Sequence, residues 1–170
     1  MTPPLPAPRG TPYRIALVCL GNICRSPMAA VVLQQLVDEA GLGDQVEVTS
    51  AGTGDWHTGE PMDDRAAATL REAGLDPSSH RARHFDVAWF DRDLLLVMDA
   101  SNLADVRALG GDDERVLMFR AFDPEGGPDA EVPDPWYGGR RGFDDVLAIV
   151  SRTGEALVRE LERLLGERLP

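Results

Sequence analysis

The residues best suited to chemistry lie in one short segment near the N-terminus. Cys19 and Arg25 are separated by five residues, among them Gly21 and Asn22. Glycine and asparagine tolerate the left-handed backbone conformation that a tightly curled loop requires. At a helix N-terminus, the backbone N–H groups of such a loop and the helix dipole attract a phosphate-like anion. The segment therefore predicts an anion-binding loop formed by Leu20, Gly21, Asn22, Ile23, Cys24 and Arg25.

Cys19 and Arg25 would have different tasks in this loop. The planar Arg25 guanidinium is able to hold two phosphoryl oxygens at once. Cys19 would lie at the base of the loop, where the N–H groups and Arg25 stabilise a thiolate. In an arbitrary chain, the same spacing favours a buried structural cysteine and a surface arginine. Here an apolar strand precedes the loop and Ser26-Pro27 opens a helix, so we expect a phosphate receptor that contains its own nucleophile.

The amino-acid composition excludes several other kinds of chemistry and partner. The net charge of −12, from 29 acidic and 17 basic residues, argues against a partner such as nucleic acid. Every basic residue is arginine, which excludes Schiff-base chemistry and the lysine-containing phosphate loop of ATPases. The two cysteines and three histidines lack the spacing of a metal cluster. We expect neither a metal nor a cofactor.

The chain also lacks the sequence signals of membrane or secreted proteins. No apolar run approaches the roughly 18 residues of a membrane span. Residues 1–12 contain five prolines and no hydrophobic signal segment. Two cysteines are too few for a disulfide framework. These features predict a cytoplasmic protein without a membrane partner, and they leave export without a signal peptide open.

Alternating apolar and amphipathic runs predict an α/β fold. Residues 1–12 are expected to be a disordered or extended Pro-rich tail, with order beginning at Tyr13 in a single domain over 13–170. Strands are expected over 14–20, 46–50, 94–98 and 115–119. Helices are expected over 26–40 with Ser26 as N-cap, 61–73, 101–109 and 143–169.

This alternation predicts a three-layer fold in which a four-stranded parallel sheet is flanked by helices. Ligands of such sheets bind at the carboxyl ends of the strands. The loop after the first strand is therefore the expected site of the chemistry.

Residues 18–27, Val-Cys-Leu-Gly-Asn-Ile-Cys-Arg-Ser-Pro, closely resemble the signature of the low-molecular-weight protein tyrosine phosphatases. A second motif, Val-Pro-Asp-Pro-Trp-Tyr-Gly at 132–138, resembles the same family in the expected order. The resemblance extends over nearly the whole chain from Tyr13 and implies the Rossmann-like fold of that family. Shorter matching segments are 49–53, 65–66, 79–83 and 98–102.

The resemblance implies that the protein hydrolyses phosphotyrosine proteins or peptides and releases inorganic phosphate. Cys19 would attack phosphorus to give a cysteinyl-phosphate, which water then hydrolyses. Arg25 would clamp the phosphoryl oxygens, and the Ser26 hydroxyl would donate to the Cys19 sulfur. Asp134 corresponds to the general acid of the family. Chemistry requires one, because a tyrosine leaving group has a pKa of about 10.

The resemblance also assigns a substrate slot and its support. Trp136 and Tyr137 would form one wall and Trp56 the other, although Trp56 fits a core-capping role equally well. Tyr137 is in addition a candidate target of a cognate tyrosine kinase. The residues expected to support the loop are Asn22, Ser50, His80 and Asp99.

Cys24 has two open roles: a small apolar side chain behind the loop, or a partner that traps oxidised Cys19 as a reversible disulfide. Related families fit less well. Arsenate reductases of this fold use a third cysteine, which the chain lacks, and protein-arginine phosphatases have threonine where Ile23 stands. A non-catalytic phosphoprotein-binding module would have no need of Cys19 and Asp134, and both are present. The family usually has an acid at Ala30, and it more often has tyrosine at Trp136.

Overall fold

β1, Tyr13–Cys19, is the central strand of the structure, a computed structural model that describes residues 2–111 and 113–166. The sheet is completed by three further strands, β2 (Val46–Gly52), β3 (Leu94–Val97) and β4 (Val116–Met118). All pairings are parallel, and the strand order is β2-β1-β3-β4. The predicted four-stranded parallel sheet is confirmed.

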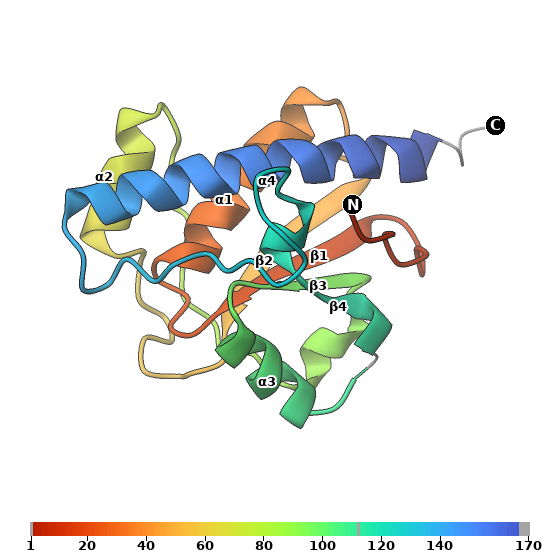
Figure 1. The fold of residues 1–170 in the computed structure, drawn as a ribbon, viewed down its shortest axis with the longest axis horizontal. Coiled ribbons are helices and arrows are strands. Elements are labelled where there is room, and N and C mark those ends of the chain that lie inside the picture. The colour runs from red at the N-terminus through yellow and green to blue at the C-terminus, as the bar shows by residue number, and fades with distance from the viewer. Residues whose placement is uncertain (1, 112, 167–170) are drawn as a thin grey trace.

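Helices cover both faces of this sheet, which makes three layers (Figure 1). α1, α2 and α4 pack together on one face, and α3 packs on β3 and β4 on the other. Their bounds are Arg25–Glu39 for α1, Asp64–Glu72 for α2, Ala100–Ala108 for α3 and Arg140–Gly166 for α4. The described part of the chain also has three short 3₁₀ helices that were not predicted: Val87–Asp91, Asp113–Arg115 and Phe119–Phe122.

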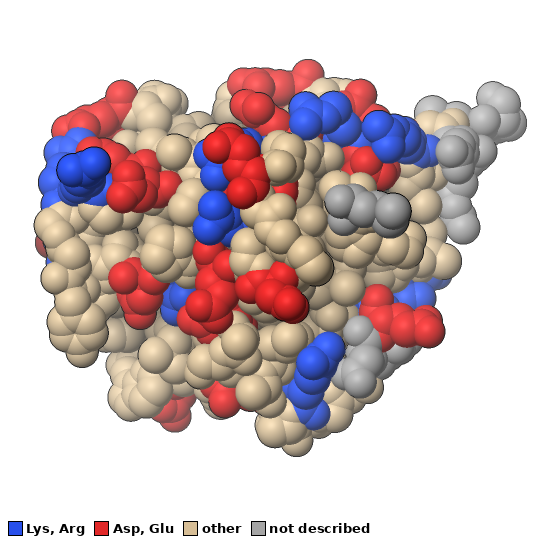
Figure 2. Space-filling model, viewed as in Figure 1, with Lys and Arg blue, Asp and Glu red and all other residues tan. Residues whose placement is uncertain are grey.

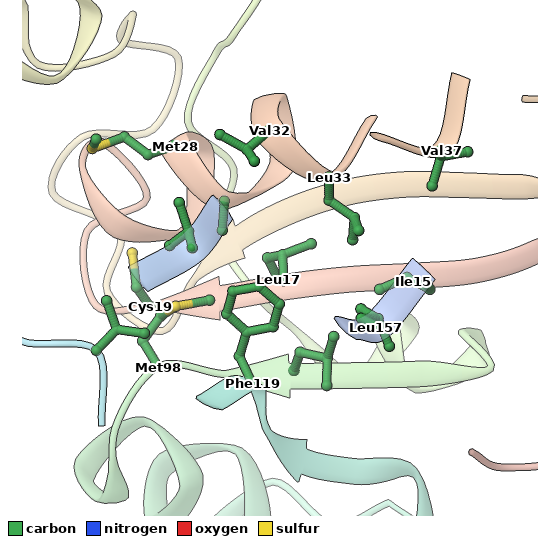
Figure 3. Close-up of a cluster of buried hydrophobic side chains, with 14 of the residues drawn as sticks. Ile15, Leu17, Cys19, Met28, Val32, Leu33, Val37, Met98, Phe119 and Leu157 are labelled. Atoms are coloured by element: carbon green, nitrogen blue, oxygen red, sulfur yellow. The ribbon is translucent and has the colours of Figure 1, made fainter. Parts of the chain in front are cut away.

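The alternation of side chains along β1 divides the core into two clusters. Ile15, Leu17 and Cys19 face α1 and α4, where they pack with side chains such as Leu33 and Leu157 (Figure 3). The intervening residues of β1 face the cluster on the α3 side. A strand buried on both faces reads as a continuous apolar run, as β1 does. Cys19 therefore extends a row of core side chains to the carboxyl edge of the sheet.

The strand order explains where a ligand can enter. From β1 the chain passes through α1 to β2 on one side, and it returns to pair β3 on the other side of β1. The connections therefore separate at the carboxyl end of β1. Open α/β sheets bind ligands at such a switch point, because the diverging connections leave a crevice there.

The start of α1 differs from the prediction. α1 begins at Arg25, its N-cap is Cys24, and no side chain caps it by a hydrogen bond. Ser26 as N-cap is therefore wrong: it lies in the first turn, where its hydroxyl contacts Cys19 and Asn22 instead of a backbone N–H.

Two other helices also have shifted starts. α2 begins at Asp64 instead of residue 61, because the Asp63 carboxylate accepts the N–H groups of Arg65 and Ala66 and so caps it. α4 begins at Arg140, three residues before the predicted start. The predicted end of this helix, at 167–169, lies outside the described residues.

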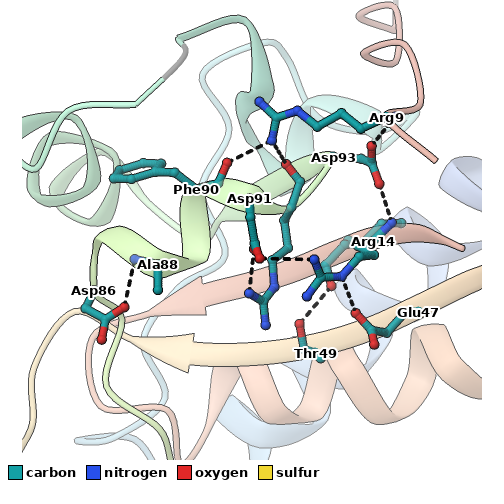
Figure 4. A network of polar contacts seen from close by, with 11 residues as sticks. Arg9, Arg14, Glu47, Thr49, Asp86, Ala88, Phe90, Asp91 and Asp93 are labelled. Carbon is teal, nitrogen blue, oxygen red and sulfur yellow. Dashed lines mark hydrogen bonds and ion pairs between the residues drawn. The ribbon is translucent and has the colours of Figure 1, made fainter. Parts of the chain in front are cut away.

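The segment before β1 bends back against the domain (Figure 1). The buried Asp93 carboxylate accepts the backbone N–H groups of Arg9 and Arg14, each at 2.7 Å (Figure 4). Tyr13 Oη donates to Pro6 O at 2.9 Å, and Leu5 packs against the core. Ordered contacts therefore begin before Tyr13, and the chain bends at residues 9–12. The division into a tail and one domain stays a prediction.

Charged side chains of both signs share the surface. On the face in Figure 2, arginines lie among acidic side chains, as expected for an acidic chain in which many arginines form ion pairs. Among the helices of residues 2–111 and 113–166, none has both the length and the apolar character needed to cross a membrane.

Candidate active site

The loop between β1 and α1 curls around the Cys19 sulfur. Asn22 has φ of 57°, the left-handed conformation predicted for this loop. Its backbone N–H donates to Cys19 Sγ at 3.3 Å, and Ser26 Oγ lies 2.9 Å from the same sulfur. Cys19 is 3% exposed. The sulfur is thus surrounded by hydrogen-bonding groups that can stabilise a thiolate.

The Asn22 side chain holds the loop in this shape. Its Nδ2 donates to Ser26 Oγ at 2.8 Å and to Ser50 Oγ at 3.0 Å, and its Oδ1 accepts the Arg83 N–H at 2.9 Å. His80 Nε2 donates to the Asn22 carbonyl oxygen at 2.7 Å. The structure thus brings together Asn22, Ser50 and His80, the residues to which the family resemblance assigned loop support.

His80 serves this network in its neutral form. Burial lowers the pKa of His80, and the positive charges of Arg83 and Arg81 act in the same direction, although the bond to Asn22 O opposes them. Since Nε2 donates to a carbonyl oxygen, the single proton of the neutral ring resides on that nitrogen.

Gly52, at the end of β2, lets the loop approach the sheet closely. A Cβ at this position would lie 2.7 Å from Leu20 O and 3.1 Å from Asn22 N. The next residues continue the contact, since Thr53 N–H donates to Cys19 O and Gly54 N–H to Leu20 O. A larger residue at 52 would push the loop away from the sheet.

Arg25 is buried and held from two sides. Its Nη1 donates to Asp99 Oδ2 at 2.7 Å and to Val132 O at 3.0 Å. Burial alone would lower the pKa of Arg25, but the nearby Cys19 and the bond to Asp99 raise it, so the guanidinium stays charged. Asp99 also caps α3 by accepting the Asn102 N–H. The predicted supporting position of Asp99 is thus next to Arg25.

Asp134 faces Arg25 from a loop on the opposite side of the site. Its Oδ2 lies 3.8 Å from Arg25 Nη2, and its Oδ1 accepts the Trp136 N–H at 3.0 Å. The side chain is about half exposed. An acidic group here can reach both solvent and a ligand bound by Arg25.

These groups surround a single cavity of about 290 Å³. Its lining includes Cys19, Arg25 and Asp134, together with the rest of the curled loop except Asn22. Asn22 is fully buried behind the loop, so its predicted contact with phosphate is limited to its backbone, and its side chain belongs to the support. The lining residues are Cys19, Leu20, Gly21, Ile23, Cys24, Arg25, Trp56, His57, Asp134, Trp136 and Tyr137.

Three aromatic residues rise around the cavity mouth. Trp56 is 68% exposed and Tyr137 96%, and both line the cavity with Trp136. The core-capping role for Trp56 is therefore wrong. Its ring instead lies over Gly54, where a Cβ would clash with ring carbons. The structure brings Trp56, Trp136 and Tyr137 to one cavity, and their role as walls for a substrate ring stays a prediction.

His57 is a lining residue that sequence reasoning missed. Its ring packs on Gly21, where a Cβ would lie 3.2 Å from His57 Cδ2, and its Nδ1 pairs with Glu60. The His57 and Trp136 ring centroids are 6.2 Å apart. Adjacency to Trp56 was the one available signal, since a loop that places Trp56 at the cavity also places its neighbour there.

Cys24 differs in character from Cys19. Both thiols are buried and unpaired. Burial raises the pKa of the Cys24 thiol, and the charges of Asp63 and Cys19 add to the effect. A thiol that resists ionisation is a poor nucleophile, and both roles considered for Cys24 stay open. Within the described residues, no group of three or more His, Cys, Asp or Glu side chains is placed to hold a metal ion.

The comparisons with known proteins agree with this site. Residues 14–166 match the sequence profile of the family described as low molecular weight phosphotyrosine protein phosphatase. A low molecular weight protein-tyrosine-phosphatase of Streptomyces coelicolor is 46% identical over 151 residues, covering 86% of this chain and 92% of the relative. Low molecular weight protein-tyrosine phosphatase A of Mycobacterium tuberculosis is 43% identical over 159 residues, covering 93% of this chain and 94% of the relative.

Solved structures show the same architecture. A protein tyrosine phosphatase from Entamoeba histolytica, with Hepes in its active site, superposes with a TM-score of 0.83 at 30% identity, covering 89% of this chain and 97% of that one. YfkJ from Bacillus subtilis gives a TM-score of 0.83 at 32% identity, covering 95% and 99% of the two chains. Sequence profile, relatives and fold agree: the chain belongs to the low molecular weight phosphotyrosine protein phosphatase family.

Proposed function

We propose that this protein hydrolyses phosphotyrosine monoesters in proteins or peptides through a cysteinyl-phosphate intermediate. The observation that carries the proposal is the placement of Cys19 Sγ at the base of a cavity that Arg25 and Asp134 also line. The family to which the chain belongs is named for this activity.

In the first step, the Cys19 thiolate attacks phosphorus. The S–P bond forms as the bond from phosphorus to the tyrosine oxygen breaks, and protonated Asp134 transfers its proton to that oxygen. The charged Arg25 guanidinium and the backbone N–H groups of the loop stabilise the negative charge on the phosphoryl oxygens. Tyrosine leaves as a neutral phenol.

In the second step, water attacks the cysteinyl-phosphate. The Asp134 carboxylate accepts a proton from the water as the P–O bond forms, and the S–P bond breaks. The electron pair returns to Cys19, where the Ser26 hydroxyl at 2.9 Å stabilises the departing thiolate. Inorganic phosphate leaves, and Cys19 and Asp134 regain their starting protonation states.

The shape and lining of the cavity favour phosphotyrosine over other phosphoryl substrates. Trp56, Trp136 and Tyr137 provide aromatic faces for a phenyl ring, which phosphoserine lacks. Ile23 presents an apolar side chain that has no hydroxyl to accept a phosphoarginine guanidinium.

Substitution of Asp134 by asparagine tests the acid. Because p-nitrophenol is a better leaving group than tyrosine, Asp134→Asn should reduce kcat/KM for p-nitrophenyl phosphate less than for a phosphotyrosine peptide. The expected loss on the peptide is on the order of 10²-fold or more. Equal losses of kcat/KM on the two substrates would contradict the role of Asp134 as the general acid.

Initial rates with phosphotyrosine, phosphoserine and phosphoarginine peptides in the presence of EDTA test the substrate class. We expect turnover of the phosphotyrosine peptide alone, undiminished by the chelator. Preferential turnover of either other peptide would overturn the proposed specificity.

Two further parts of the proposal concern its cellular setting. The 96% exposure of Tyr137 supports the proposal that a cognate tyrosine kinase modifies this residue at the cavity mouth. A free thiol at Cys19 is needed for catalysis, which supports action in a reducing compartment such as the cytoplasm.

A further inference from the structure

Arg65, in the first turn of α2, makes an unusually complete set of contacts for a surface arginine. Its Nε and Nη2 donate to the two carboxylate oxygens of Asp63, each at 3.2 Å. Its remaining terminal nitrogen, Nη1, donates to Trp136 O at 3.0 Å. The guanidinium thus joins the N-cap of α2 to the loop that carries Asp134.

Aromatic rings pack against the same guanidinium. Arg65 Cζ lies 5.1 Å from the centroid of the Trp136 ring and 4.8 Å from that of Phe143. Contacts of this kind stabilise a cation over an aromatic face. Arg65 therefore fixes Trp136 both by its carbonyl oxygen and by its ring.

Both ends of this connection reach the reacting groups. At one end, the Asp63 N–H donates to Ile23 O, in the loop that surrounds Cys19, at 2.9 Å. At the other end, the Trp136 N–H donates to Asp134 Oδ1 at 3.0 Å. A continuous path of hydrogen bonds and short chain segments thus links the Cys19 loop, through Arg65, to the proposed acid.

The loop that carries Asp134 needs such a restraint. Between Val132, whose N–H donates to Met98 O, and the start of α4 at Arg140, the chain forms no helix or strand. Arg25 lies 3.8 Å from Asp134, but its guanidinium is already bound to Asp99 and is needed by the substrate. A displacement of a catalytic group by about 1 Å costs on the order of 10²-fold in rate.

We propose that Arg65 is a positioning residue that sets the Asp134 carboxyl and the Trp136 wall over Cys19. This inference rests on the proposed function, because it assigns to Arg65 an effect exerted through the general acid. Arg65 is not among the residues that line the cavity with Cys19. Its removal therefore weakens proton donation to the leaving group and leaves the nucleophile in place.

The test compares kcat/KM for a phosphotyrosine peptide and for p-nitrophenyl phosphate, since kcat/KM reports the step in which the phenol leaves. Arg65→Met removes the hydrogen bonds and keeps a long side chain. We expect a loss of about tenfold on the peptide and about twofold on p-nitrophenyl phosphate. Arg65→Lys keeps the charge, but one ammonium is unable to reproduce the planar contacts, so a smaller selective loss should remain.

Combination with Asp134→Asn separates positioning from a general structural effect. If Arg65 acts through the acid, Arg65→Met should cause little further loss on the peptide in the Asp134→Asn background. Arg71→Met is the matched control, because Arg71 is exposed in the last turn of the same helix, and it should leave both rates unchanged. Thermal unfolding of each variant verifies that the protein is folded.

Two results would overturn the inference: equal losses on the two substrates, or an undiminished further loss in the Asp134→Asn background. If Arg65→Met does not fold, the same comparison is made with Arg65→Lys. A failure of the proposed function is distinguishable, because Asp134→Asn alone would then show no selectivity between the two substrates.

Discussion

Asn22 Nδ2 donates to Ser26 Oγ at 2.8 Å, and this bond orients the hydroxyl that lies 2.9 Å from the Cys19 sulfur. Asn22 combines this role with φ of 57°, a conformation that few residues adopt at low cost. One residue therefore sets both the backbone curl and the hydroxyl beside the nucleophile.

Two substitutions of Asn22 should separate these contributions. Asn22→Gly keeps the left-handed conformation and loses the hydrogen bonds, whereas Asn22→Ala loses both. Both variants should have reduced kcat/KM, and Asn22→Ala should be less stable than Asn22→Gly by about 1 kcal/mol. Urea unfolding and initial rates provide the measurements. Equal activity of Asn22→Gly and the unaltered protein would show that the hydrogen bonds are dispensable.

Cys19→Ser should abolish turnover and retain phosphate binding. The loop N–H groups and Arg25 that hold the anion are unchanged, whereas serine is a far weaker nucleophile than a thiolate. Calorimetric titration with inorganic phosphate measures the retained binding, and initial rates with a phosphotyrosine peptide measure the lost turnover. Appreciable turnover by this variant would contradict the assignment of the nucleophile.

His80 should make stability fall on the acid side of neutrality. Because burial lowers the pKa of His80 in the fold, the unfolded chain binds the proton more readily. Its contribution is thus fully present above the unfolded pKa of about 6.5 and is lost as the pH falls below it. Urea unfolding at pH 7.5 and 5.5 measures the decline, which should be smaller in His80→Gln. An equal decline in both proteins would assign it to other groups.

Protonation of Asp123 should cause a second loss of stability, at a lower pH than that of His80. Arg152 donates two hydrogen bonds to its buried carboxylate and Arg120 one, and these partners hold the pKa of Asp123 far below its usual range. Stability from this group is present above the unfolded pKa of about 3.9 and is lost as the pH falls. Asp123→Asn should cost about 2–4 kcal/mol at pH 7 by urea unfolding.

Glu125 offers a matched control for that measurement. Its carboxylate lies 3.1 Å from Arg152 Nε, but the side chain is 68% exposed. Surface ion pairs contribute little because water screens them, so Glu125→Gln should cost less than about 1 kcal/mol. Similar losses of stability in the two variants would mean that burial does not strengthen the hydrogen bonds of Asp123.

Local features of the chain were predictable, because they depend on neighbouring residues. The apolar run of β1, the Gly21-Asn22 turn and the start of a helix near Pro27 identify the anion-binding loop without any distant contact. Even here the role of Ser26 as N-cap was wrong, since its hydroxyl is used by the active site. A hydrogen bond to the Cys19 sulfur, seven residues away, is not visible in the helix-capping preference of Ser26.

The contacts that complete the site could not be predicted from local sequence patterns. Arg25 is bound by Asp99 and by the carbonyl oxygen of Val132, and any residue could supply a carbonyl oxygen. Arg65 meets Trp136 across 71 positions of sequence, through an irregular segment whose path follows from packing. The short helix at Val87–Asp91 was missed for a similar reason, since it is brief and lies within a segment without clear periodicity.

The position of β1 between two partners has a consequence for how the enzyme loses activity. The amide protons of an interior strand exchange with solvent only when the whole sheet opens, whereas loops and helix ends open on their own. Cys19 is the last residue of that strand. Its sulfur should therefore keep its position until the whole domain unfolds. Protection from hydrogen exchange at Ala16 to Val18 and residual turnover should therefore be lost together as temperature rises.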